Sequence, residues 1–235
     1  MRHPIGAIAL CLSAASSLAT TDARAEAWPD VKTPPNAEMQ MVATDMLLNG
    51  KPCRLLRFDV HATEAEVLAF YRHEMGAKRV VENRLKNDPV IATRQGDYFV
   101  TVQLHALNPQ TMQGTVMTTL LSAKPATSLV LLDTQKVFPA DTQVISTVQT
   151  ADAGKRSLVL IGVNFNSLRA NRDHVVAALM ERGFRPSKSD TALDDRDPTL
   201  VSMHLSSPVE EASVTISDDG ARRSVVINRV REGSK

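Results

Sequence analysis

The chain has 235 residues and a formal net charge of +1 at pH 7, with 43% hydrophobic but only 4% aromatic residues. A charge so close to zero gives no electrostatic reason to bind nucleic acid, and aliphatic side chains must fill the cores. The chain has two cysteines, Cys11 and Cys53.

The first 25 residues have the features of a secretory signal peptide. Arg2 supplies the positive start, residues 5–18 are small and apolar, and Ala23-Arg24-Ala25 forms a cleavage motif. We therefore expect cleavage after Ala25, and a periplasmic or secreted product of zero net charge. An uncleaved anchor is the alternative, but the apolar stretch is short for a membrane span. The residue before Cys11 is not small, which argues against lipoprotein processing.

Residues 26–38 are a Pro-rich lead-in, expected to be extended. They contain Trp28, the only tryptophan of the chain. Two roles stay open for this side chain: packing against the first folded unit, or contact with a partner protein.

Residues 39–124 are predicted to form a first α+β unit. Asn49-Gly50 is the preferred pair for a two-residue hairpin turn, and the segments Gln40–Leu48 and Arg54–Val60 flank it as strands. The Thr63-x-x-Glu66 spacing predicts a capping box at the start of a helix over residues 64–75. Gly76 is placed to end that helix.

Residues 139–235 repeat this order after a linker at residues 125–138. Ala153-Gly154 separates two strand-like segments, Asn171 is a good N-cap for a helix over residues 172–182, and Gly183 follows that helix. Three strand candidates follow each helix, and they are residues 90–94, 98–105 and 115–123 in the first unit and 199–205, 212–217 and 224–230 in the second. We therefore predict an α+β protein of two tandem ββαβββ units, each a mainly antiparallel sheet covered by one helix.

The sequence contains no recognisable catalytic or metal-binding motif. His73-Glu74 lacks the second histidine of a zinc protease helix, and no G-x-S-x-G is present. Cys53 is expected to be a small apolar strand residue, with a thiol nucleophile or an intermolecular disulfide bridge as the alternatives. His105 and His204 fall at similar places in the two halves, so they are either ordinary strand histidines or a paired site. We expect no cofactor and no metal.

These observations favour a non-catalytic exported scaffold or adaptor that binds another envelope protein, with secretion or pilus systems as the expected setting. Two alternatives stay open: a small-molecule or lipid-binding protein that uses the cleft between the units, and a hydrolase with a dispersed site. Peripheral membrane contact would be weak. The candidate partner contacts are Trp28, Leu129, Leu131, Arg229 and Arg231.

Overall fold

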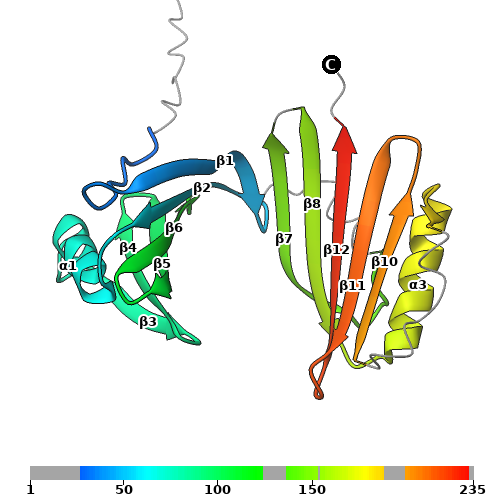
Figure 1. Cartoon of the computed structure of the whole chain (residues 1–235). Coiled ribbons are helices and arrows are strands. Elements are labelled where there is room, and N and C mark those ends of the chain that lie inside the picture. The colour runs from blue at the N-terminus through cyan, green and yellow to red at the C-terminus, as the bar shows by residue number, and fades with distance from the viewer. Residues whose placement is uncertain (1–26, 124–135, 153, 188–198, 233–235) are drawn as a thin grey trace, which may run out of the picture.

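The computed structural model describes residues 27–123, 136–152, 154–187 and 199–232, and the predicted signal peptide, Leu129 and Leu131 lie outside these residues. The described residues form a mostly antiparallel sheet with two helices, as expected for an α+β protein. In Figure 1 the two helices, α1 (Glu64–Met75) and α3 (Leu168–Glu181), lie at opposite ends of the picture with the strands between them.

The N-terminal half begins with the predicted hairpin of β1 (Glu38–Leu48) and β2 (Lys51–Val60). Asn49 and Gly50 both have positive φ, 51° and 76°, as a type I′ turn requires. Four strands follow α1, and they are β3 (Val81–Leu85), β4 (Asp88–Gln95), β5 (Tyr98–Asn108) and β6 (Thr111–Leu120).

Helix α1 has the bounds that its end signals predict. The Thr63 hydroxyl accepts a bond from the Glu66 backbone N–H, and the Glu66 carboxylate accepts one from the Thr63 N–H. This capping box satisfies two otherwise unpaired donors of the first turn. Gly76 follows with a φ of 81°. The buried face of the helix consists of Val67, Leu68, Tyr71 and Met75.

In the C-terminal half the described residues form α3 and six strands, and these are β7 (Gln143–Asp152), β8 (Lys155–Asn164), β9 (Arg185–Pro186), β10 (Leu200–Ser206), β11 (Glu210–Asp218) and β12 (Arg223–Glu232). The predicted start of its helix was wrong. Ser167 is the N-cap, and its hydroxyl accepts a bond from the Ala170 N–H. Asn171 lies inside the helix and is completely buried.

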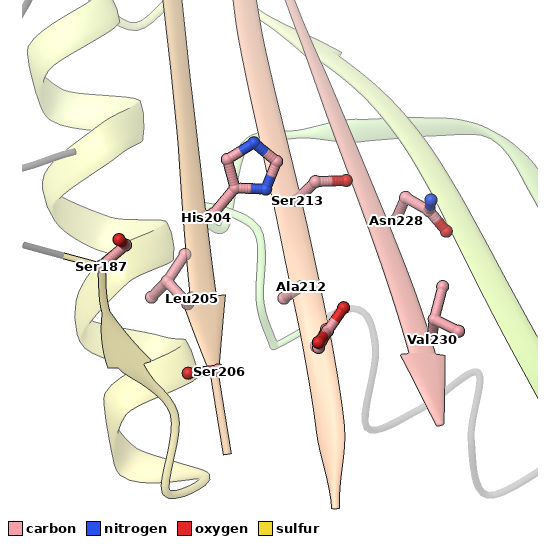
Figure 2. Close-up of a pocket in the computed structure, with 9 residues that line it drawn as sticks. Ser187, His204, Leu205, Ser206, Ala212, Ser213, Asn228 and Val230 are labelled. Carbon is pink, nitrogen blue, oxygen red and sulfur yellow. The ribbon is translucent and has the colours of Figure 1, made fainter. Parts of the chain in front are cut away.

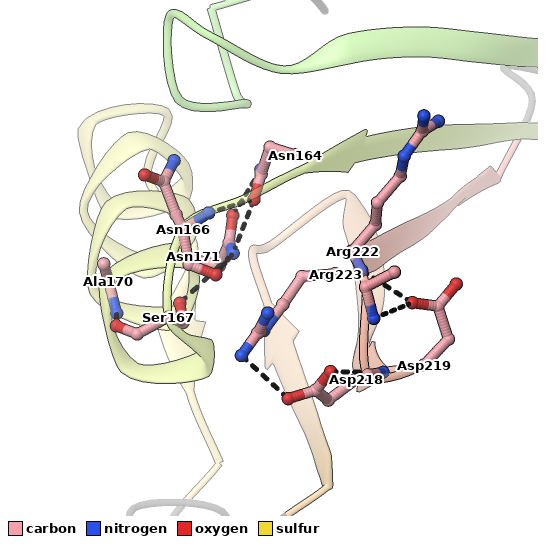
Figure 3. A network of polar contacts seen from close by, with 11 residues as sticks. Asn164, Asn166, Ser167, Ala170, Asn171, Asp218, Asp219, Arg222 and Arg223 are labelled. Atoms are coloured by element: carbon pink, nitrogen blue, oxygen red, sulfur yellow. Dashed lines mark hydrogen bonds and ion pairs between the residues drawn. The ribbon is translucent and has the colours of Figure 1, made fainter.

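Asn171 is buried because it completes a polar network with the end of β8 (Figure 3). The amides of Asn164 and Asn171 bond reciprocally at 2.7 and 3.0 Å. Asn164 also bonds the Thr142 hydroxyl. Buried amides need such partners, so this network fixes the first turn of α3 against the sheet.

Each half has one strand more than predicted, β3 and β9. Every residue of β3 is exposed, so its sequence lacks the alternation of a half-buried strand. Strand β9 has only two residues. The neighbour order from edge to edge is β3-β4-β5-β6-β2-β1-β7-β8-β12-β11-β10-β9. The order from β1 outward is therefore repeated from β7 outward, strand for strand.

Each half has its own hydrophobic core between its helix and its strands. The N-terminal core includes Phe58, Tyr71, Ile91, Leu104 and Met112, all at most 1% exposed. The C-terminal core consists of Val137, Phe138, Leu160, Val175, Leu179, Phe184, Val201, Met203, Leu205, Ala212, Val214, Ile216, Val225 and Ile227. Each core is built largely from aliphatic side chains, as the composition predicted.

The two halves meet where β1 pairs with β7. The register joins only three residue pairs, and they are Met46 with Thr150, Leu47 with Gln149 and Leu48 with Val148. Two further bonds of 2.8 Å link Asn49 to Thr147, one from the Asn49 N–H to the Thr147 carbonyl and one from the Thr147 N–H to the Asn49 side chain. The two halves thus share one sheet through a short seam.

Candidate interaction site

Both helices cover the same side of the sheet. In the C-terminal half, Leu158 packs against the core beneath α3, and it lies opposite Gln149, which in turn lies opposite Leu47. Leu47 lies opposite Pro52, and alternation along β2 places Pro52 on the side of Phe58, beneath α1. The other side of the sheet is therefore covered by no helix or strand of the described residues. We call it the open face.

The open face is rich in apolar side chains along the middle of the sheet. Those of the N-terminal half are Met46, Cys53, Leu55, Phe99 and Met117, and those of the C-terminal half are Val148, Val159, Ile161, Val226 and Val230. Met46 and Cys53 are buried among their neighbours, Phe99 is exposed, and the others are half-buried. Strand β8 is apolar on both sides from Leu158 to Val163. A strand with one solvated face normally alternates apolar with polar residues, so this pattern is typical of a strand covered on both faces.

The outer strands of the C-terminal half carry polar groups on the open face. His204, Ser213 and Asn228 lie in one row across β10, β11 and β12. They line a shallow hollow of about 390 Å³ together with Ser206 and Glu211 (Figure 2). The open face thus changes from aliphatic at its middle to polar at this outer edge.

A second cavity, of about 410 Å³, lies on the helix side at the seam. We call it the seam cavity, and it is lined by Asp45, Leu47, Gln149, Thr150, Ala151, Arg156, Ser157, Leu158, Glu210, Arg229 and Arg231. Its walls come from β1, β7, β8, β11 and β12, so both halves contribute. Two of the predicted partner contacts, Arg229 and Arg231, are brought together here.

The two arginines have different surroundings. Arg229 donates two bonds to the Glu210 carboxylate at 2.9 and 2.8 Å, and its guanidinium lies 5.6 Å from the centre of the Phe184 ring. Arg231 is exposed and lies directly opposite Arg156 on β8. Neither Arg231 nor Arg156 forms an ion pair with a residue in the described ranges.

The structure places Trp28 away from the seam cavity. Its ring centre lies 5.2 Å from that of Tyr98, and the Arg54 guanidinium lies 4.6 Å from the tryptophan ring. The lead-in residues Trp28 to Val31 line a hollow with Arg54 on the helix side of the first half. Trp28 therefore packs on its own chain while staying partly exposed.

The histidines do not form a matched pair. His105 lies on β5 and His204 on β10, and these strands occupy different positions in the order of the two halves. His105 Nδ1 lies 3.0 Å from an Asp88 carboxylate oxygen, and this bond, with a second from Gln103, lowers the pKa of Asp88. Within the described ranges, no hydroxyl or thiol hydrogen-bonds to His105, so this pair is not joined to a nucleophile.

Cys53 is 1% exposed on β2, and burial raises the pKa of its thiol. A buried, protonated thiol is a poor nucleophile, which matches the apolar role expected from the sequence. Among the described residues, no group of three or more His, Cys, Asp or Glu side chains is arranged to hold a metal ion. Neither α1 nor α3, the helices of the described part of the chain, is both long and apolar enough for a membrane span.

Sequence reasoning named Arg229 and Arg231 as candidate contacts and did not name Arg156, Glu210 or Asp45, which line the same cavity. These residues are close only through strand register and through the pairing of β1 with β7, which no local pattern encodes. The apolar run of β8 was the one available signal for the open face. Comparison with family models, curated proteins and solved structures finds no match to this chain.

Proposed function

We propose that this chain is an exported, non-catalytic scaffold or adaptor that binds another envelope protein through the open face and the adjoining seam. The observation that carries the proposal is the placement of both helices on one side of the shared sheet. Aliphatic side chains such as Val159, Ile161 and Val226 are left on the other side. These side chains are half-buried, so they keep part of their apolar surface accessible, and a contiguous accessible apolar surface is typical of a protein interaction site.

The proposal that the chain is exported depends on the N-terminal sequence, which has a charged start, an apolar segment and the Ala23-Arg24-Ala25 motif. We further infer that the two halves are tandem copies of one unit, because the order of strands outward from β1 recurs outward from β7. A pair of such units joined side by side gives an extended sheet, and such a sheet offers more contact area than either unit alone.

Envelope extracts and surface variants test this proposal. Thr101 and Thr215 are half-buried on the open face of the two halves, so T101R and T215R place a bulky charge there without entering either core. Ala177 is exposed on α3, and A177R is the matched control. We expect the partner recovered with tagged wild-type protein to fall about tenfold in T101R and T215R, as for a contact worth ~1.4 kcal/mol, and to be unchanged in A177R.

Melting temperatures establish that the three variants are folded. Equal recovery by wild type, T101R and T215R would contradict the assignment of the open face. The absence of any protein that copurifies with the wild type, even after crosslinking, would contradict the scaffold function itself.

A second candidate is binding of a small molecule, because the hollow around His204, Ser213 and Asn228 has a volume of about 390 Å³. That volume lies within the range of natural ligand pockets. Ligands that bind only the folded protein raise its melting temperature. A shift produced by an envelope metabolite, and lost in S213L, would favour this function over the scaffold.

A further inference from the structure

The seam cavity holds two arginines that face each other, and neither forms an ion pair with a residue that the structure describes. Arg156 and Arg231 are directly opposite in the β8–β12 register, which places their Cβ atoms about 5 Å apart. Like charges in this position destabilise a sheet. An anion bound between or above the two guanidinium groups would offset this repulsion.

The nearest carboxylate is already engaged. Glu210 lies directly opposite Arg231 on β11, but both of its oxygens bond the Arg229 guanidinium. Arg229 is in turn fixed over the Phe184 ring, so this ion pair is held in place. The side chains of Arg229 and Glu210 are only 15% and 16% exposed. Breaking such a pair would leave a largely buried charge uncompensated, so Glu210 stays paired with Arg229 rather than with Arg231.

The other carboxylate of the lining, Asp45, comes from β1. It is exposed and forms no ion pair with a residue in the described part of the chain. Asp45 belongs to a segment in which the β1–β2 register shifts between Ala43 and Met46. The β1–β7 pairing starts only at Met46, so β7 does not pair with the part of β1 before this residue.

We propose that Arg156 and Arg231 bind a carboxylate of an acidic, extended segment of the partner protein. This inference rests on the proposed function and names the chemistry of one contact. Guanidinium groups bind carboxylates through two parallel hydrogen bonds. An extended segment fits because the cavity lies beside the part of β1 that pairs with β2 but not with β7, and such an edge can accept an added strand.

Binding of a fluorescein-labelled hexaglutamate peptide, followed by anisotropy at low salt, tests the proposal. We expect R156Q/R231Q to bind the peptide at least tenfold more weakly than the wild type. The control R79Q/R169Q removes the same charge from exposed positions outside the cavity and should change the affinity less than twofold. D45N should bind about two- to fivefold more tightly, the scale of one exposed charge pair.

Equal affinity of the wild type and R156Q/R231Q, or an equal loss in the control, would overturn the proposal. Vesicles with 30% phosphatidylglycerol and inorganic phosphate serve as competing probes. Arginine-dependent binding of vesicles or phosphate without binding of hexaglutamate would assign the site to another anion and overturn the peptide assignment. If R156Q/R231Q recovers the partner as well as the wild type while T101R and T215R do not, the scaffold function stands and this inference fails.

Discussion

Substitution of Gly114 by alanine should destabilise the N-terminal half through one identifiable clash. Gly114 lies opposite Phe58 in the β2–β6 pair, and a Cβ atom added to it would lie 2.0 Å from Cζ and 2.1 Å from Cε1 of the Phe58 ring. The ring is fully buried and packs against Tyr71, with 6.1 Å between ring centres.

The size of the effect follows from two opposing terms. Overpacking a core costs about 1–3 kcal/mol, and contacts this short place G114A near the upper end of that range. Replacing glycine by alanine in a strand stabilises the folded state by about 0.5–1 kcal/mol, because alanine loses less backbone entropy on folding. We therefore expect a net loss of about 2–2.5 kcal/mol, or roughly 1–1.3 M in the urea midpoint for an m value of about 2 kcal/mol/M.

Urea unfolding followed by Trp28 fluorescence is the appropriate assay, because this single tryptophan packs against Tyr98 in the affected half. F58L should also destabilise the protein by leaving a cavity. The double variant G114A/F58L should lose about 0.5–3 kcal/mol less than the sum of the single variants, because the smaller side chain removes the clash. T115A, on the open face of the same strand, is the control. Strict additivity of G114A and F58L would refute the reasoning.

Three further predictions concern buried and charged groups. N171A should lower the free energy of unfolding by about 1–3 kcal/mol, because it leaves the Asn164 amide without its buried partner; an unchanged urea midpoint would contradict this. Y71F should leave stability unchanged or raise it by up to about 1 kcal/mol, since the buried hydroxyl has no hydrogen-bond partner among the described atoms; a loss above 1 kcal/mol in the same assay would show that the hydroxyl is bonded. Hydrogen bonds lower the pKa values of Glu82 and Asp88 in the folded state, so the contribution of these carboxylates to folding stability is present above pH 4.5 and is lost as pH falls further. In thermal melts, the melting temperature of E82Q/D88N should therefore fall less steeply with decreasing pH than that of the wild type. Equal slopes would contradict this.

Elements with strong local signals could be predicted from the sequence. The Asn49-Gly50 turn and the capping box of Thr63 and Glu66 are specified by residues within a few positions of each other, and both were found. Strand β3 was missed because all of its side chains face solvent, so its sequence has no hydrophobic period. Asn171 was misplaced because a good N-cap residue is also a good buried hydrogen-bonding residue, and tertiary contact decided between the two roles.

Most of the candidate site could not be predicted, because it depends on contacts between distant segments. The β1–β7 seam consists of three residue pairs with no distinctive sequence, and it decides that both helices lie on one side of the sheet. Arg156 and Arg231 become neighbours only through the β8–β12 register. Their charges are visible in the sequence, but their pairing is not.

Site-specific photo-crosslinking in cells tests the central claim, that the open face binds another exported protein. A benzoylphenylalanine at Val226, near the middle of the open face, should give one dominant protein adduct, and the same group at Ala177 on the outer surface of α3 should give none. Equal adducts from both positions, or no protein adduct from Val226, would contradict the account.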